Sequence, residues 1–452
     1  MNPNLTKLVE LIKAREVTPV EVAQTCLERI AELNPALNAV VTIAPDVLER
    51  ARAAEAALMR GEAAGLLHGV PLTIKDTIET AGLRTTSGST VRQDYVPSAD
   101  APAVARLKAA GAIILGKTNA AEMAMDYTAD NPVFGRTNHP LDTKLTPGGS
   151  SGGEAVAIAT GMSPGGLGSD LAGSVRIPAH FCGIAGLKPT TGRVPGEGQF
   201  PPSTGPYGLG AVIGPIARSV ADLRLLFRVL VNEAAPPVDL KSLRIAWYAN
   251  DGVVRVTDET AGAVRAAAMA LIESGLIAEE RLPPHVARGN QLWISLFSRA
   301  SVVQLRQTYA GREHEGGSFV KWRLATADQT PPPTLDEYIA GWMERDRLRE
   351  ELLRWMETTP IILCPVGATP AYEHDTLKVT VGGETFGTFR AFSYAQTFNV
   401  FDLPVVTVPA GRSAEGLPIG VQIVGRPNAE EMVLAVAEIV EQALSSVIFR
   451  YD

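Results

Sequence analysis

A glycine- and serine-rich stretch in the first half of the chain places the strongest constraint on its fold. Between Pro147 and Gly186 the sequence reads PGGSSGGEAVAIATGMSPGGLGSDLAGSVRIPAHFCGIAG. The stretch has no run of charges and little of the polarity of a flexible linker, and its apolar residues are spread along it. We therefore expect a packed core whose backbone passes close to another group, because glycine permits such an approach.

Composition excludes several classes of protein. The 452 residues include 41 basic and 49 acidic side chains, a net charge of −8, which argues against a nucleic-acid partner. The 42 glycines and 32 prolines exceed the usual share but stay below that of low-complexity chains. The three cysteines have no short spacing, which argues against a disulfide framework or a zinc site, and we expect no cofactor. With no signal-peptide pattern and no long apolar run, we expect a cytoplasmic protein without membrane contact.

The pattern of elements predicts an α/β protein made of one large domain, residues 1–452. Thr18 and Glu21 form a capping box that starts a helix at Pro19. A short apolar strand over 70–74 carries Lys75 at its end. Further helices are expected over 45–60, 152–161, 258–274 and 335–356, further strands over 112–115, 244–248 and 361–364, and irregular structure over most of 279–338.

Two motifs in this chain match known patterns without the context that those patterns need. Residues 111–118 satisfy GxxxxGK[ST], but their middle residues are Ala-Ile-Ile-Leu, a strand that cannot wrap a phosphate. Residues 148–152 satisfy GxSxG, but no apolar strand precedes them and no downstream histidine lies in a recognisable loop. Both the nucleotide-binding module and the histidine-dependent hydrolase are therefore disfavoured.

A third interpretation joins two serines to a lysine, and the segments that carry these residues resemble the amidase signature family of serine hydrolases. The resemblance covers about 68–232 and 398–443, whereas about 240–392 is a variable region without a match. Its matching segments are GVPLTIKD at 69–76, GGSSGG at 148–153, GSDLAGSVRIP at 168–178, FCGIAGLKPT at 181–190, PVVTVPAG at 404–411 and GLPIGVQIVG at 416–425. The resemblance implies a central mixed, twisted β-sheet with helices on both faces.

The resemblance also implies roles for individual residues. Ser174 matches the acylated nucleophile, Ser150 the bridging serine whose preceding peptide is cis, and Lys75 the base. A lysine acts as a base only when neutral, so Lys75 needs apolar burial that lowers its pKa from about 10.4 to near 7. The remaining matches are oxyanion-hole amides at Leu171, Ala172, Gly173 and Ser174, supporting residues at Asp170, Arg176 and Ser151, and a substrate-pocket position at Ala124.

The family's pattern is not followed everywhere. Ala172 stands where relatives more often have glycine, and Ala120-Ala121 and His139-Pro140-Leu141 depart from the common residues near the substrate side. These departures leave the acyl preference open. His139 and His180 are expected to be structural, because a lysine mechanism does not need them.

The function implied is hydrolysis of carboxylic amide C–N bonds through an acyl-serine intermediate, without a cofactor. Carbamate (urethane), anilide or ester cleavage by the same triad is the alternative. A less favoured alternative is that the chain is the glutamine amidotransferase subunit of tRNA-dependent amidation. The expected partner is a small-molecule amide or carbamate substrate, and a homodimer is possible from the sequence. Residues 279–338 are expected to form a lid or wall of the site.

Overall fold

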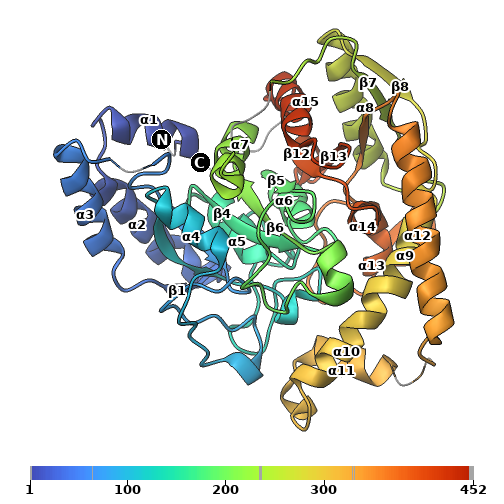
Figure 1. The fold of residues 1–452 in the computed structure, drawn as a ribbon, viewed down its shortest axis with the longest axis horizontal. Helices are drawn as coiled ribbons and strands as arrows, with labels where there is room; N and C mark the ends of the chain where they lie inside the picture. The colour runs from blue at the N-terminus through green and yellow to red at the C-terminus, as the bar shows by residue number, and fades with distance from the viewer. Residues whose placement is uncertain (1–2, 64, 234–236, 328, 330, 447–452) are drawn as a thin grey trace.

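One mixed sheet of eleven strands runs through the molecule (Figure 1). The computed structural model describes residues 3–63, 65–233, 237–327, 329 and 331–446. In order across the sheet the strands are β1 (Val40–Ile43), β3 (Ile113–Thr118), β2 (Pro71–Lys75), β4 (Gly165–Asp170), β6 (Val212–Ala217), β5 (Ala185–Lys188), β12 (Val405–Arg412), β13 (Pro418–Val424), β9 (Ile361–Pro365), β7 (Arg244–Trp247) and β8 (Ile277–Glu280).

Parallel pairing is confined to two parts of this sheet. β3, β2 and β4 are parallel neighbours, and so are β9, β7 and β8, while the remaining pairs are antiparallel. The carboxyl end of β2 therefore lies beside the end of β3, with Lys75 paired to Thr118. The α/β class and the mixed central sheet expected from the sequence are confirmed.

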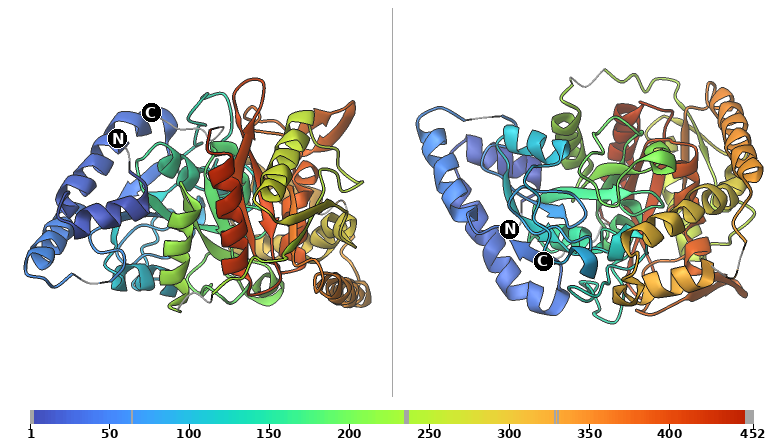
Figure 2. Two further views of the ribbon diagram at one scale, coloured as in Figure 1. Left: turned by 90° about the horizontal axis from the view of Figure 1, so that it is seen from above. Right: turned by 60° about the horizontal axis from the view of Figure 1, so that its bottom comes forward.

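Helices cover both faces of the sheet (Figure 2). A Cβ atom at Gly165 would meet Leu5 and Leu226, whereas one at the next residue, Gly166, would meet Glu154 on the other face. The first layer comprises α1 (Leu5–Lys13), α4 (Pro102–Ala109), α7 (Val220–Val231), α8 (Asp258–Glu273) and α15 (Glu430–Ala443), and the second contains α5 (Gly152–Ala159) and α6 (Arg176–Cys182). Among the described residues, no helix combines the length and apolarity that crossing a bilayer requires.

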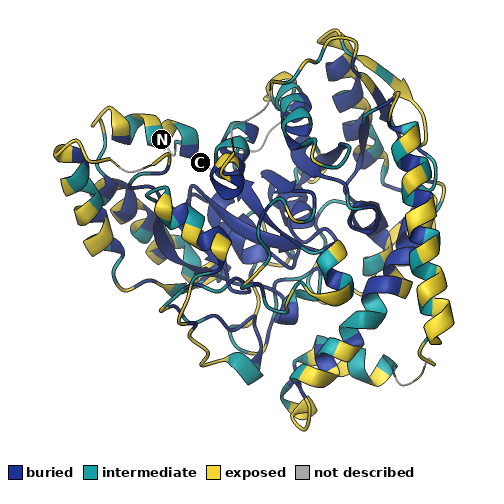
Figure 3. Cartoon of the chain, viewed as in Figure 1, coloured by how far each residue is buried: buried dark blue, intermediate teal, exposed yellow. Residues whose placement is uncertain are grey.

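Three further helices lie at the two ends of the sheet. α2 (Pro19–Leu37) and α3 (Val47–Met59) pack together near β1, and α12 (Leu335–Trp355) lies at the opposite end of the molecule (Figure 1). Figure 3 shows the central strands of the sheet buried and the outward faces of α3 and α12 exposed. The short helices α13 (Thr388–Ala391) and α14 (Ser393–Val400) follow the hairpin of β10 (Lys378–Val381) and β11 (Glu384–Gly387).

Most sequence-based elements are confirmed within two or three residues. The capping box at Thr18 forms as expected, with Glu21 donating its backbone N–H to the Thr18 hydroxyl. The GxxxxGK[ST] match lies in β3, and its Lys117 is buried and bonded to the Ile78 carbonyl and to Thr80. Lys117 therefore forms hydrogen bonds within the protein, and the segment that contains it is a strand and not a phosphate-binding loop.

The expectation of irregular structure over 279–338 is wrong for much of that segment. The segment contains α9 (Gly289–Trp293), a π-helix (Ile294–Ser298), α10 (Arg299–Thr308) and α11 (Ser318–Ala327). Val302 and Leu305 are buried on one face of α10 with the spacing of an α-helix. The π turn before them is wider, so the buried Leu296 and Phe297 do not continue that spacing. This shift of phase obscures the periodicity from which a helix is predicted.

Candidate active site

Lys75, the last residue of β2, is completely buried beside two serines. The apolar residues 70–74 that precede it are buried as well, which is the environment expected from the sequence. Its Nζ donates hydrogen bonds to Oγ of Ser150 at 2.6 Å and to Oγ of Ser169 at 3.0 Å. A buried amine is thus held within proton-transfer distance of Ser150.

Burial lowers the pKa of Lys75 from 10.5 to about 7. Two buried carboxylates, Asp170 and then Glu154, oppose this shift because they favour the ammonium form. Glu154 accepts hydrogen bonds of 2.6 Å from the hydroxyls of Thr73 and Thr118, and burial raises its own pKa to about 7. A neutral amine is therefore available at Lys75 near neutral pH.

The glycine cluster shapes the turn that presents Ser150. Gly148 has φ +80°, and the peptide between Gly149 and Ser150 is cis, as the family resemblance implied. A Cβ atom on Gly149 would lie 2.4 Å from the Thr128 carbonyl oxygen, so a larger residue cannot occupy this position. The turn then leads directly into α5 and leaves Ser150 buried against Lys75.

The loop after β4 carries unpaired amides next to Ser174. Gly173 adopts φ +108°, a conformation that favours glycine, and its N–H donates to Oδ1 of Asp170 at 2.9 Å. Among the described residues, nothing accepts from the backbone N–H groups of Leu171, Ala172 and Ser174. Three of the four amides expected in the oxyanion hole are thus free, while the Gly173 amide shapes the loop.

Asp170 and Arg176 hold this loop through a buried ion pair. Both side chains are completely buried, with Nη2 of Arg176 2.9 Å from Oδ1 of Asp170. Burial acts to raise the pKa of Asp170, but the Arg176 guanidinium outweighs it and keeps the pKa well below its usual range. Asn399 and Gln422 accept further hydrogen bonds of 2.6 Å from Arg176. Both residues, predicted from the sequence as supports, thus contact the loop that carries Ser174 or its neighbours.

Replacing Asp170 with alanine is expected to destabilise the protein by about 3–5 kcal/mol, because Arg176 would remain buried without its anion. Urea unfolding of the wild type and the variant measures this difference. Asp170→Asn is the matched control and should cost less, since the amide oxygen still accepts one of the loop hydrogen bonds. A loss below about 1 kcal/mol in Asp170→Ala would contradict the assignment.

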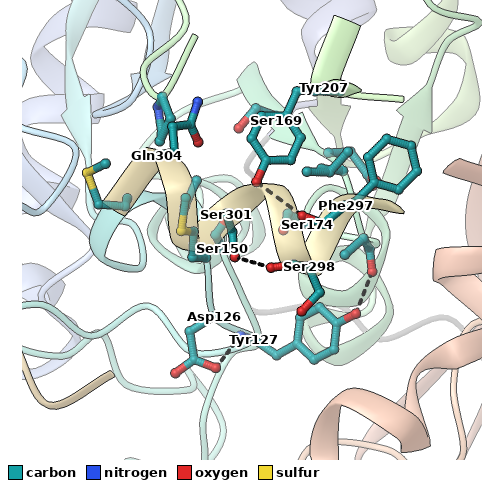
Figure 4. Close-up of a pocket in the computed structure, with 18 of the residues that line it drawn as sticks. Asp126, Tyr127, Ser150, Ser169, Ser174, Tyr207, Phe297, Ser298, Ser301 and Gln304 are labelled. Atoms are coloured by element: carbon teal, nitrogen blue, oxygen red, sulfur yellow. Dashed lines mark hydrogen bonds between the residues drawn. The ribbon is translucent and has the colours of Figure 1, made fainter. Parts of the chain in front are cut away.

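Beside these groups lies a cavity of about 300 Å³. Ser150, Ser169 and Ser174 contribute to its wall, and Figure 4 shows them gathered near Ser298 and Ser301 of the neighbouring helical segment. Its aromatic lining consists of Tyr127, Tyr207, Trp293, Phe297, Phe319, Trp322 and Phe389. The space therefore suits a largely apolar ligand whose reacting group meets the serines.

The segment predicted to form a lid or wall contributes much of this lining. Trp293 and Phe297 belong to α9 and the π-helix, and Phe319 belongs to α11. Nε1 of Trp293 donates to the Leu171 carbonyl oxygen at 3.0 Å, which connects this wall directly to the loop beside Ser174. The wall and the reacting groups thus come from different parts of the chain.

The other predicted positions are near the serines. Ala124 lines the cavity together with Met123 and Met125, and both Ala124 and Met123 have φ +57°. Ser151 is buried behind the reacting groups, and its N–H donates to the Ser174 carbonyl oxygen at 3.2 Å. This bond brings the turn at Ser150 against the turn at Ser174.

The two histidines expected to be structural are bonded to the backbone. Nε2 of His139 lies 2.9 Å from the Phe181 carbonyl oxygen, and Nε2 of His180 lies 3.0 Å from that of Thr369. Burial lowers the pKa of each imidazole to about 4, so both are neutral at neutral pH. Neither lines the cavity, which disfavours the GxSxG interpretation with a histidine base.

Comparison with known proteins identifies the family. The family model described as Amidase matches residues 21–434. The chain belongs to the amidase signature family, whose members act on amide C–N bonds. Fatty-acid amide hydrolase 2-A of Danio rerio is 33% identical over 97% of this chain and 88% of its own length. A glutamyl-tRNA(Gln) amidotransferase subunit of Roseiflexus castenholzii is 34% identical over 95% of this chain and 93% of its own length.

Solved structures agree with this assignment. A crystal structure of an amidase superposes on 98% of this chain and 100% of its own, with a TM-score of 0.88 and 28% identity. The amidase fold therefore extends through the variable region as well as through the segments that carry the sequence resemblance.

Sequence reasoning missed two groups of this amidase site. Ser169 was not singled out, although it lies within the matching segment 168–178 and contacts Lys75. Tyr127 was also missed; its hydroxyl donates to the Ala172 carbonyl oxygen at 2.8 Å and its ring stacks on Phe389. No local sequence signal marks Tyr127, because both of its partners lie far along the chain.

Proposed function

We propose that this amidase hydrolyses small carboxylic amides through an acyl-Ser174 intermediate, with Lys75 as the base and Ser150 as the proton carrier. The observation that carries the proposal is the contact between the buried Nζ of Lys75 and Oγ of Ser150, at the wall of a largely apolar cavity. The lowered pKa of Lys75 supports it, because the amine can accept a proton near pH 7.

In the acylation step, Oγ of Ser174 attacks the carbonyl carbon while its proton passes to Ser150, whose own proton passes to neutral Lys75. The carbonyl oxygen becomes negative and accepts from the free amides of Leu171, Ala172 and Ser174. Collapse of this intermediate breaks the C–N bond, and the proton returns from Lys75 through Ser150 to the leaving nitrogen. Water then attacks the ester by the same route and releases the acid and free Ser174.

A serine-directed phosphonyl fluoride tests the nucleophile. The probe should add to Ser174, and peptide mass spectrometry would locate the label. Turnover of a simple anilide should fall in proportion to the fraction of protein labelled. Label on another serine, or full labelling without loss of turnover, would refute the proposed role of Ser174.

Carbamates and esters are the closest second substrate class, because they present a similar carbonyl to the same groups. Three derivatives of one aryl alcohol or amine, an amide, a carbamate and an ester, would rank these reactions by kcat/KM. A carbamate or ester turned over far faster than its matched amide would move the assignment to urethane or ester hydrolysis.

The similarity to the amidotransferase protein of Roseiflexus castenholzii supports a different function, in which glutamine is the amide and the ammonia goes to charged tRNA. A chain with that function is expected to need its partner protein. Turnover of small amides by the purified chain alone, without preference for glutamine, would exclude this alternative. Turnover that requires added partner proteins and glutamine would support it.

The pH dependence of kcat/KM should follow the ionisation of Lys75. Since only the neutral amine accepts a proton, activity should rise about tenfold per pH unit below pH 7 and level off above it. Initial rates between pH 5 and 9 on a neutral amide measure the profile. A flat profile through pH 7 would contradict the assignment of Lys75 as the base.

Glu154→Gln provides a directional control for this profile. The Glu154 carboxylate raises the pKa of Lys75, so its removal should move the midpoint toward lower pH while the plateau is retained. A midpoint that moves upward would show that another group controls the profile.

A further inference from the structure

A guanidinium with free donors lines the amidase cavity. Arg323, on α11, contributes to the cavity wall, and its Nη2 donates to the carbonyl oxygen and the hydroxyl of Ser298 at 2.5 and 2.6 Å. Within the described part of the chain, Nε and Nη1 of Arg323 have no acceptor, and no carboxylate lies within 4 Å of the side chain. Nη2 is thus held by Ser298, whereas Nε and Nη1 remain available to donate hydrogen bonds to a ligand.

The surroundings of Arg323 are positive. Burial lowers its pKa, and the nearby Arg299 lowers it further, since the two cations repel each other. A second cavity, of about 860 Å³, shares Tyr207 and Gln304 with the first and is lined by Arg299. Arg323 and Arg299 thus place two cations beside this space, which favours an anion there.

The carboxylates in the wall of the first cavity are engaged within the protein. Asp170 is paired with Arg176, and Asp126 accepts from the Tyr127 N–H at 2.7 Å and from the Thr128 hydroxyl at 3.0 Å. Neither forms an ion pair with Arg323. A ligand anion would therefore gain charge-assisted hydrogen bonds at Arg323 without displacing an existing partner.

We propose that Arg323 is a specificity residue that selects amides carrying a carboxylate on a flexible chain. The amide group would lie at the serines, the chain along the aromatic wall, and the carboxylate on the open edge of the guanidinium. This inference rests on the proposed amide hydrolysis and adds the charge of the substrate to it.

Matched ligands test the inference by binding, without turnover. Each set has one chain length, between five and eight carbons, and ends in a methyl, a carboxylate or an ammonium group. One scaffold carries the chain on the acid side of an anilide, and a second carries it on the amine side of a benzamide. Calorimetry on Ser174→Ala should give the carboxylate roughly a 10- to 100-fold lower Kd than the methyl analogue in one scaffold, with the ammonium weakest.

Variants then locate the preference. Arg323→Gln should remove the advantage of the carboxylate, Arg323→Lys should retain part of it, and Arg312→Gln should leave it unchanged. Arg312 is a suitable control because it lies in the same region but forms an exposed pair with Glu315. The three ligands are compared on the same preparation of each variant. The ratio of their Kd values is then independent of any change in the stability of that variant.

The outcomes separate this inference from the proposed function. Equal affinity for the three chain ends in both scaffolds, a preference for ammonium, or a carboxylate preference that survives Arg323→Gln would overturn the role of Arg323. If wild-type protein then still hydrolyses the methyl-ended anilide and takes up the phosphonyl label at Ser174, the proposed hydrolysis stands. Failure of labelling and turnover, with the carboxylate preference intact, would reject the chemistry alone.

Discussion

Ser174→Ala is expected to lower kcat for amide hydrolysis by at least about 10³-fold, because it removes the hydroxyl that we propose forms the acyl intermediate. The change removes one hydroxyl from a small, largely buried residue, so the fold should be retained. Stopped assays on a chromogenic anilide, with the thermal midpoint measured in parallel, give both quantities. The variant should also lose phosphonylation completely.

Two comparisons make this prediction decisive. Ser98→Ala makes the same chemical change at an exposed loop residue and should retain wild-type kcat. The double variant Ser174→Ala with Lys75→Met should be no slower than the single one, since residues that act as a unit do not add. Residual turnover within tenfold of wild type in purified Ser174→Ala would reject the acyl-serine route.

Lys75→Met should lower kcat by at least about 10³-fold, because Ser174 and Ser150 would have no base to take their proton. Lys75→Arg should be similarly inactive, since a guanidinium does not deprotonate in a protein. Methionine avoids the cost of burying an ammonium group, so the thermal midpoint of Lys75→Met at pH 6 should not fall. An inactive but stable variant would separate catalysis from folding.

Lys117→Met is the matched control for this change. Lys117 is equally buried and lies on the adjacent strand, but it donates to a carbonyl oxygen and a threonine away from Ser150. On the same argument its replacement should not lower the thermal midpoint, and kcat per labelled active site should stay within a few-fold of wild type. Equal losses of kcat in both variants would refute a specific role for Lys75.

The sequence was sufficient to predict the class of fold and the neighbourhood of the reacting residues. Lys75 ends an apolar strand and Ser150 lies in a glycine cluster, and these are local signals that a single sequence contains. The structure adds that Lys75 reaches both Ser150 and Ser169, and that Asp170 engages the Gly173 amide. Such contacts depend on how distant strands meet, which no local pattern records.

The wall of the cavity was the hardest part to anticipate. The aromatic side chains of 289–327 are recognisable in the sequence, but the π-helix changes their phase. Arg323 looks there like any other charged residue of a surface helix, since only the structure reveals that none of the described carboxylates is paired with it. Selectivity is thus encoded in tertiary packing more than in any motif.

The position of Arg176 has a consequence for synthesis on the ribosome. Its guanidinium needs Asn399 on α14 and Gln422 on β13, both more than 220 residues further along the chain. A nascent chain that has emerged only through Ser174 already contains Lys75, Ser150 and Ser174. It still lacks Asn399 and Gln422, which hold the loop through Arg176. The loop at 171–174 therefore gains these two anchors only when α14 and β13 have joined the fold.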